Sequence, residues 1–201
     1  MELKDFSYFL PEELIAQHPC SRRDHSRLLF LDKKQQNMND LSFFQLPDLL
    51  QKDDVLVIND SKVIPARLFG KKQTGALMEI LLLTKRKSDR EYQTWEVLIR
   101  PAKRLREHDV VSLEGNGEAK VLERISDKKW LLEFFAQEGF DNYLKKFGRA
   151  PLPPYIKRKK NASPDVTDLE RYQTIYARNP GSIAAPTAGL HFSEEVIQAL
   201  R

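Results

Sequence analysis

The chain has 201 residues, 41% of them hydrophobic and 31% charged, which suits a soluble globular protein with one large core or two modest ones. No apolar run approaches the roughly 18 to 20 residues that cross a bilayer, and acidic residues stand near the start where a secretory signal carries bases, so we predict a cytoplasmic protein without a membrane partner. The single cysteine excludes an internal disulfide, and the four histidines lack metal-ligand spacing, so we expect no metal.

The first 60 residues are expected to form short helices and strands. A proline followed by two glutamates predicts a helix over residues 11–17. The run RLLFLD, residues 27–32, predicts a short buried strand, and a Ser-x-x-Gln capping box predicts a short helix over 42–50. The continuous apolar run VLVIN, residues 55–59, is typical of a strand buried on both faces.

Residues 67–135 change to short β runs separated by turns. Two runs lie at 77–84 and 94–100, two more flank the hairpin sequence Gly-Asn-Gly at 115–117, and KWLLEFF follows at 129–135. Five or so closely spaced strands fit a small barrel or a curled antiparallel sheet.

A proline-rich segment, GRAPLPPYIKRKKNASPD at 148–165, favours an extended connection that returns the chain to the first domain. We therefore predict an α/β domain with an inserted small antiparallel β-barrel domain. The α/β main domain takes residues 1–66 plus 150–201, and the inserted barrel takes residues 67–149.

Basic residues are clustered, although the net charge is only +4 and the pI about 9.1. Seven bases and no acid lie between Lys145 and Lys160, and four more lie on the stretch RPAKRLR at 100–106. Such clusters, interleaved with aromatic residues, suit a polyphosphate partner because each phosphate contact releases condensed counterions. A solvated loop is the alternative, since basic runs are common on ordinary surfaces.

The common nucleotide-binding and hydrolase signatures are absent. What remains is a set of five short motifs rich in polar, aromatic and proline residues, which we call phrases. They are NDSKVIPARL (59–68), RPAKRL (100–105), APLPPYIKR (150–158), YQTIYA (172–177) and IAAPTAGLHF (183–192). The first leaves the end of a strand, where α/β sheets place ligands, and the second offers guanidinium groups that grip phosphates. The third presents Tyr155 and Arg158 to a base and a phosphate. The structural alternatives are a capped turn, inert rim arginines and packing of Tyr155 against the prolines.

The last phrase leads into a helix start. Ser193 makes a good N-cap with glutamates in the first turn, and Phe192 with Ile197 would form a hydrophobic staple. His191 is thereby held beside a helix N-terminus, which disfavours imidazolium, so a neutral His191 could accept a proton or donate a hydrogen bond at about pH 7. Gly189 would allow a close backbone approach by a ligand. A purely structural histidine is the alternative.

These five phrases, in this order, resemble the S-adenosylmethionine:tRNA ribosyltransferase-isomerase family of the queuosine pathway. The match runs from DFSYFLPEELIAQHP near the start to PTAGLHFSEEV near the end and covers almost the whole chain. The resemblance implies that the ribosyl part of S-adenosylmethionine is transferred to an aminomethyl-deazaguanine base in the tRNA anticodon and isomerised to give epoxyqueuosine, with release of adenine and methionine. It also implies an α/β domain with an inserted β-barrel, and no Rossmann-type site for S-adenosylmethionine.

The implied reaction assigns roles to residue types. The carbon beside a sulfonium is acidic and needs a general base, while departing adenine needs a proton or a hydrogen bond. The expected catalytic acid or base groups are His191 and Asp60. The residues expected to bind S-adenosylmethionine, or to stack on adenine and the target base, are Thr187, Gly189, Tyr155, Tyr172 and Tyr176. Phosphate or carboxylate contacts are expected from Arg67, Arg100, Lys103, Arg104 and Arg158.

Members of this family are considerably longer, and this chain stops at Arg201 inside the helical sequence EEVIQALR. We therefore expect a C-terminal part of the α/β domain to be absent, and an exposed apolar edge to be covered by self-association or by pairing with that part. The alternatives to an enzyme are a fragment that acts only as a non-catalytic tRNA-binding module and an inert assembly subunit.

Overall fold

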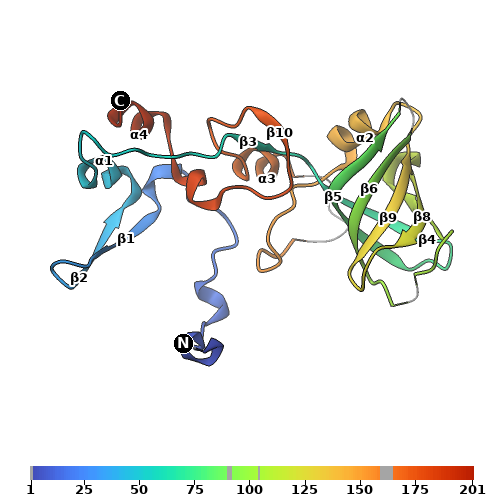
Figure 1. Ribbon diagram of the computed structural model, residues 1–201, viewed down its shortest axis with the longest axis horizontal. Helices are drawn as coiled ribbons and strands as arrows, with labels where there is room; N and C mark the ends of the chain where they lie inside the picture. The colour runs from blue at the N-terminus through green and yellow to red at the C-terminus, as the bar shows by residue number, and fades with distance from the viewer. Residues whose placement is uncertain (1, 90–91, 104, 159–164) are drawn as a thin grey trace.

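The computed structural model describes residues 2–89, 92–103, 105–158 and 165–201 (Figure 1). In this view a β-barrel lies at one end, and a hairpin, a two-stranded parallel sheet and short helices extend from it. The fold is the predicted one, an α/β domain with an inserted antiparallel β-barrel. None of the described helices is long and apolar enough to cross a membrane.

Six strands close the barrel in the order β4-β5-β6-β9-β8-β7, and every neighbouring pair is antiparallel. Their bounds are β4 Arg67–Lys72, β5 Leu77–Ser88, β6 Tyr92–Arg100, β7 Val110–Leu113, β8 Glu118–Arg124 and β9 Lys129–Phe135. The runs predicted at 77–84, 94–100 and 129–135 are confirmed. Strand β4 was not predicted, because a glycine and basic residues interrupt its apolar pattern.

Alternate side chains of these strands fill the barrel. Leu68, Ile80 and Leu132 have an exposed fraction of 1% or less, and many inward positions of the other strands are equally buried. Trp95 and Trp130 are also buried in the barrel, so both tryptophans of the chain report on this part of the molecule. In β9 the buried positions alternate with partly exposed ones, as expected for a strand with one face packed inward, whereas β6 is buried along most of its length.

Helix α2, Phe140–Phe147, packs against the barrel through its aromatic side chains. Phe140 stacks on Phe134 of β9, with ring centroids 4.6 Å apart. Gly115, in the hairpin turn with φ +64°, leaves the space that Phe147 fills, because a Cβ at Gly115 would overlap the Phe147 ring. The predicted Gly-Asn-Gly turn therefore also makes room for the helix.

The chain enters and leaves the barrel at adjacent points. Arg67 donates its N–H to the carbonyl of Arg149 at 3.1 Å, and Arg149 donates to the carbonyl of Arg67 at 2.9 Å. Gly148 fits here because a Cβ would come within 2.5 Å of the Leu144 carbonyl and closer still to the carbonyl of Pro65. We call this pairing of Arg67 with Arg149 the neck. Because the chain leaves the barrel next to the point where it entered, the segment after the barrel can run beside the segment before it.

Beyond the neck, strand β3, Ser61–Val63, pairs in parallel with β10, Asn179–Ser182. The side chain of Gln173 extends this pairing on the other side of β3. Its Oε1 accepts the Val63 N–H at 2.9 Å, and its Nε2 donates to the Val63 carbonyl at 3.1 Å. The backbone of β3 therefore binds both β10 and Gln173, which lie more than a hundred residues later in the sequence.

The remaining elements are short. The helices are α1 Leu46–Leu49, α3 Val166–Arg171 and α4 Glu194–Ala199, the hairpin strands are β1 Arg27–Asp32 and β2 Asn37–Ser42, and 3₁₀ turns lie at Leu3–Phe6, Glu12–Leu14, Arg23–His25, Phe43–Gln45, Glu114–Asn116 and Thr187–His191. The capping box predicted at residue 42 is present, with reciprocal bonds between Ser42 and Gln45.

Two predictions for the N-terminal part are wrong, and a third is confirmed as a strand but not as a buried one. The helix expected over 11–17 is a single 3₁₀ turn, and the strand at 27–32 forms but leaves Leu29 58% exposed. The run at 55–59 is not a strand, and Val57 is 87% exposed. No described residue makes a backbone hydrogen bond to residues 55–58, so the apolar pattern lacks the neighbouring strands that burial on both faces requires.

We expect Leu132→Ala to lower the free energy of unfolding of the barrel by about 2 to 5 kcal/mol, because it leaves a cavity at a fully buried position. Urea unfolding followed by tryptophan fluorescence measures this change. Ile125→Ala, at a 42% exposed position, is the control and should change the free energy by only about 0.5 kcal/mol. Equal losses in both variants would contradict the place of Leu132 in the core.

Candidate active site

The 3₁₀ turn Thr187–His191 leads into α4, whose N-cap is Ser193 as the sequence predicted. The Oγ of Ser193 accepts a hydrogen bond from the N–H of Val196 at 3.3 Å. The same hydroxyl donates to Oδ2 of Asp24 at 2.8 Å. Because Asp24 is only 2% exposed, this bond ties the start of α4 to a buried carboxylate near the other end of the chain.

His191 lies against an aromatic cluster at the base of α4. Its ring centroid is 5.5 Å from that of Phe43, and Phe43 meets Phe192 edge to face at 5.0 Å. Ile197 packs on the same cluster, where the predicted staple places it. One side of the His191 ring is thus occupied by apolar contacts, and the residue is half-buried.

Two arginines hold this turn to neighbouring segments. The guanidinium of Arg23 donates to the carbonyls of Leu190 and Glu170, both at 3.0 Å. Arg171, at the end of α3, donates in the opposite direction to the carbonyl of Cys20 at 2.6 Å. We call this pair the arginine clamp, and one of its anchor points is the residue directly before His191.

The electrostatic environment of His191 favours the neutral imidazole. Burial lowers the pKa of His191 below its usual value; a hydrogen bond involving the Arg23 backbone opposes this shift, and the positive charge of Arg23 adds to it. The direction agrees with the prediction from the sequence. Its main cause is burial, and the charge of Arg23 contributes in the same direction. A neutral imidazole can accept a proton at about pH 7.

Gly189 and Tyr176, both predicted to bind S-adenosylmethionine, lie together. A Cβ at Gly189 would be 2.5 Å from the Tyr176 hydroxyl, so a larger residue would require Tyr176 to move, and the group that approaches the Gly189 backbone is Tyr176. Tyr176 also meets Phe192 edge to face at 6.0 Å. Burial raises the pKa of Tyr176, which keeps its hydroxyl a neutral hydrogen-bond donor.

The other predicted cofactor-binding residues lie in different surroundings. Tyr172 is buried in a cluster with Leu152 and Ala185, whereas Tyr155 is 52% exposed on the proline-rich segment. Thr187 is exposed at the start of the 3₁₀ turn. A ligand beside His191 would therefore meet Thr187 at the surface, and reaching the ring of Tyr172 would require displacing its packing partners.

Asp60 lies at the start of β3 and is exposed. Both of its carboxylate oxygens accept from Nδ2 of Asn179 at 3.2 Å, and its carbonyl accepts from the N–H of Arg178 at 2.7 Å. Among the described residues no hydrogen bond or ion pair joins Asp60 to His191. The structure thus places the two predicted acid–base groups in separate hydrogen-bond networks.

Two of the predicted basic residues are engaged within the protein. Arg67 donates from Nη2 to the carbonyl of Leu152 at 2.6 Å, and its Nε lies 3.3 Å from Glu79. Arg158 donates from Nε and Nη2 to Asp168, both at 2.8 Å, and this pairing raises the pKa of Arg158. A phosphate at either guanidinium would compete with these partners.

Arg100 and Lys103 are exposed at the end of β6 and just beyond it, and they are accessible to a partner. Arg104 lies outside the described residues. Within the described part of the chain, no group of three or more His, Cys, Asp or Glu side chains could hold a metal ion.

Sequence reasoning missed three polar residues near the turn, of which two are buried and one is partly buried. These are Arg23 of the clamp, Asp24 and Thr174. Asp24 Oδ1 and Thr174 Oγ1 are buried without a hydrogen-bond partner in the structure, and such atoms carry a desolvation cost. The methyl carbon of Thr174 lies 2.9 Å from the position a Cβ of Gly189 would take, so Thr174 packs beside Gly189.

A model of the queuosine biosynthesis protein family matches residues 3–201. The chain is 49% identical to the S-adenosylmethionine:tRNA ribosyltransferase-isomerase of Syntrophus aciditrophicus, over all of this chain and 60% of the relative, and 44% identical to that of Fusobacterium nucleatum, over 98% and 54%. A crystal structure of S-adenosylmethionine tRNA ribosyltransferase from Thermotoga maritima is 30% identical over 98% of this chain and 53% of that one, with a TM-score of 0.35. The chain thus spans little more than half the length of the relatives it matches.

We expect the pKa of His191 to lie below about 6.5, the value of an unperturbed histidine. Histidine-selective NMR titration measures it, with the His191→Gln spectrum as the assignment control. Because the unfolded state binds more protons than the folded state below about pH 6.5, stability should fall as the pH falls through the lowered pKa. A His191 that titrates above 6.5 would contradict the neutral assignment.

Proposed function

The chain belongs to the queuosine biosynthesis protein family, and from that premise we propose that it supplies part of the active site of an S-adenosylmethionine:tRNA ribosyltransferase-isomerase. The proposed reaction moves the ribosyl part of S-adenosylmethionine to the aminomethyl-deazaguanine base of a tRNA anticodon and isomerises it to epoxyqueuosine. Adenine and methionine are released. The proposed setting is the cytoplasm, where the tRNA partner is found.

One observation carries this proposal. The half-buried His191, with a lowered pKa, is held in place through the Arg23 bond to Leu190 and stands beside the pair of Gly189 and Tyr176. The reaction needs a base for the acidic carbon next to the sulfonium and a hydrogen-bond or proton donor for departing adenine. A neutral imidazole in a fixed position suits the first of these roles, and we assign it to His191.

The remaining roles follow from position. Thr187 is exposed on the same turn, where it would donate a hydrogen bond to the ribose, and the Tyr176 hydroxyl at Gly189 would orient adenine. Tyr155 and Tyr172 are proposed to contact adenine or the target base, and Asp60 to act as the second acid or base once substrate brings the networks together. S-adenosylmethionine is a co-substrate in this scheme, and no metal takes part.

The basic residues are proposed to contact the tRNA. Arg100 and Lys103 are exposed for this purpose, whereas Arg67 and Arg158 would contribute through the segments that they fix. Arg104 is retained on the sequence pattern alone. We also propose the domain division of residues 1–66 plus 150–201 around an inserted 67–149, which the hydrogen bonds at the neck support.

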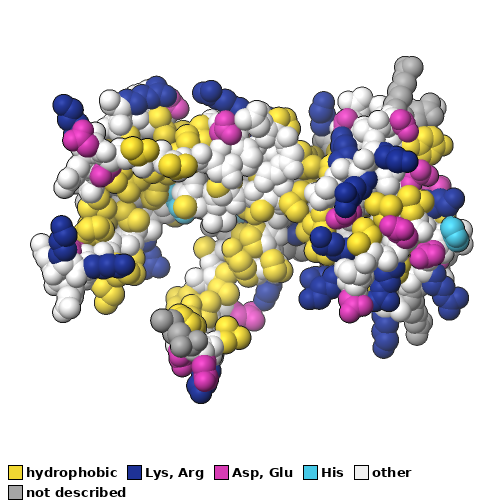
Figure 2. Space-filling view, in the orientation of Figure 1, with side chains coloured by type: hydrophobic (Ala, Val, Ile, Leu, Met, Phe, Trp, Pro, Cys, Tyr) yellow, Lys and Arg dark blue, Asp and Glu magenta, His cyan; other side chains and the backbone are white. Residues whose placement is uncertain are grey.

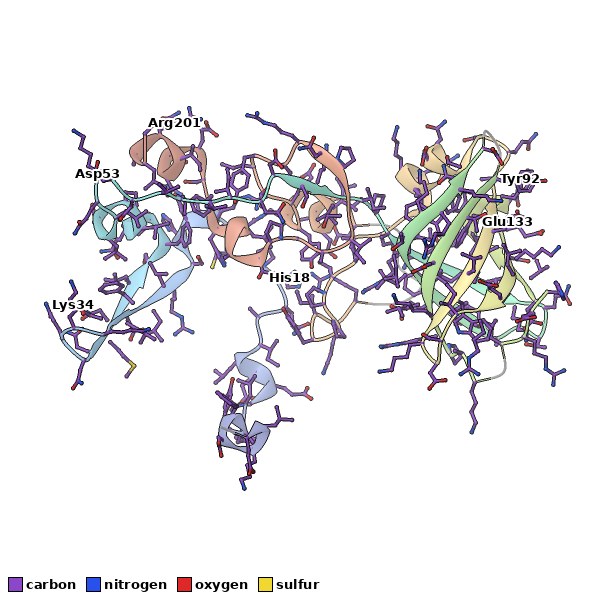
Figure 3. All side chains as sticks on the ribbon, viewed as in Figure 1. His18, Lys34, Asp53, Tyr92, Glu133 and Arg201 are labelled. Atoms are coloured by element: carbon purple, nitrogen blue, oxygen red, sulfur yellow. The ribbon has the colours of Figure 1, made fainter. Side chains whose placement is uncertain are left out.

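The reaction is tested by incubating the chain with S-adenosylmethionine labelled in adenine and with tRNA that carries the precursor base. We expect adenine release that His191→Ala reduces by about 10²- to 10⁴-fold, the range of general acid–base catalysis. His18→Ala is the control, because His18 is exposed and lies outside the turn (Figure 3). If His191→Ala released adenine at the wild-type rate, His191 would not be the catalytic acid or base.

The alternative proposal is a non-catalytic tRNA-binding module. The observation that favours it is the barrel with exposed Arg100 and Lys103, which is complete without the rest of the family's sequence. Salt-sensitive binding of tRNA without adenine release would support the module over the enzyme.

We infer further that the apolar run at 55–59 pairs with another strand, from a second copy of the chain or from further sequence of the family. Its exposed side chains and unpaired backbone among the described residues support this inference. Figure 2 shows the hydrophobic surface along the part of the molecule away from the barrel.

We expect the isolated chain to self-associate, so its weight-average mass in sedimentation should rise with concentration above the monomer mass of 23.4 kDa. Val57→Lys should reduce this rise because it places a charge on the exposed run. Met38→Lys, at a 72% exposed position on β2, is the control and should leave the rise unchanged. A constant monomer mass would contradict self-association.

A further inference from the structure

The barrel has a groove on its surface. Figure 1 shows the barrel strands at the opposite end of the molecule from α4, which follows the His191 turn. The groove lies where β4, the start of β5, the end of β6 and the end of β7 meet, and its volume is about 1170 Å³. Sites for a single small molecule usually measure about 300 to 1,000 Å³, so this groove has room for more than one ring system.

Apolar and aromatic groups line part of the groove. They include Phe69 and Leu77, and Leu77 is 48% exposed although it sits on a barrel strand. The guanidinium of Arg149 lies over the Phe69 ring, 4.5 Å from its centroid, and is fixed by a 2.8 Å bond to Glu114. Arg149 thus contacts the Phe69 ring and holds it in place, and Phe69 offers the groove an aromatic side chain of the kind on which nucleic acid bases stack.

The groove is lined by two cations and two carboxylates, and its unpaired charges are positive. Its two carboxylates are already matched, since Glu79 pairs with Arg67 at 3.3 Å and Glu114 with Arg149. Lys71 and Arg100 also line the groove and are exposed, and within the described residues neither has a carboxylate partner. Figure 2 shows Lys and Arg side chains gathered over the lower part of the barrel.

We propose that this groove binds a single-stranded stretch of the tRNA substrate, with phosphates at Lys71 and Arg100 and a base against Phe69 and Leu77. The inference rests on the proposed function, which makes tRNA the partner, and it adds a place and a mode of contact. Single strands are recognised by a cationic groove combined with stacking surfaces, because their bases are free to turn outward. Only Arg100 of these four residues was expected from the sequence.

The charge contacts are tested with a fluorescein-labelled anticodon stem-loop RNA, whose Kd for the whole chain is measured by anisotropy over a series of salt concentrations. Lys71→Gln and Arg100→Gln should each weaken binding. Each should also reduce the slope of log K against log salt by about 0.7, the value for one phosphate contact on a single strand. Lys87→Gln is the matched control, because it removes the same charge ten residues beyond Leu77 on β5, roughly 30 Å away at about 3.3 Å per residue.

The stacking contact is tested with 2-aminopurine in the loop of the same RNA. Binding to the wild-type chain should quench its fluorescence, and Phe69→Ala should abolish the quenching and weaken binding roughly 5- to 150-fold. Unchanged emission from the buried Trp95 and Trp130 verifies that the barrel of this variant is folded.

Three results would overturn the groove as an RNA site: equal Kd and salt slope for the Lys71 and Lys87 variants, equal competition by a duplex that lacks the loop, or no binding by the wild-type chain at low salt. Adenine release tests the proposed function separately. If the chain releases adenine but Lys71→Gln leaves the Kd for RNA unchanged, the groove is not the RNA site and the proposed enzyme activity stands. If the groove variants weaken RNA binding but the chain releases no adenine, the groove is the RNA site and the proposed enzyme activity is rejected.

Discussion

The two backbone hydrogen bonds between Arg67 and Arg149 are the constraint on which the rest of the structure depends. They bring the chain back to its starting point after the closed barrel, so the strand before the barrel and the segments after it can pair. The parallel contact of β3 with β10, and the bonds from Gln173 to Val63, follow from this return. Without the neck, these contacts would have to close a loop of more than a hundred residues by themselves.

The candidate active site depends on a second set of long-range bonds. Arg23 and Arg171 join the N-terminal segment, α3 and the His191 turn through backbone carbonyls, which a charged donor binds more strongly than a neutral one. The same arrangement half-buries His191 and places a positive charge nearby, and both effects lower its pKa. The position and the protonation state of the histidine therefore have a common structural cause.

The proposed functions of the main domain and of the barrel differ, and each fits the surface on which it is proposed. The turn around His191 combines one titratable group with close packing at Gly189, which suits chemistry on a small co-substrate. The groove on the barrel combines exposed cations with a stacked Phe69–Arg149 pair, which suits a flexible polyanion.

The sequence by itself determined the barrel strands other than β4, the cap at Ser193 and the family, because apolar β runs, capping residues and ordered motifs are local properties of the chain. It was wrong about 55–59, since an apolar run indicates a need for burial but cannot supply the neighbouring strands. It found His191 but not the cause of its pKa, nor Thr174, nor the groove around Phe69. Only the tertiary structure decided these, because burial, ion pairs and stacking arise between residues that the sequence holds far apart.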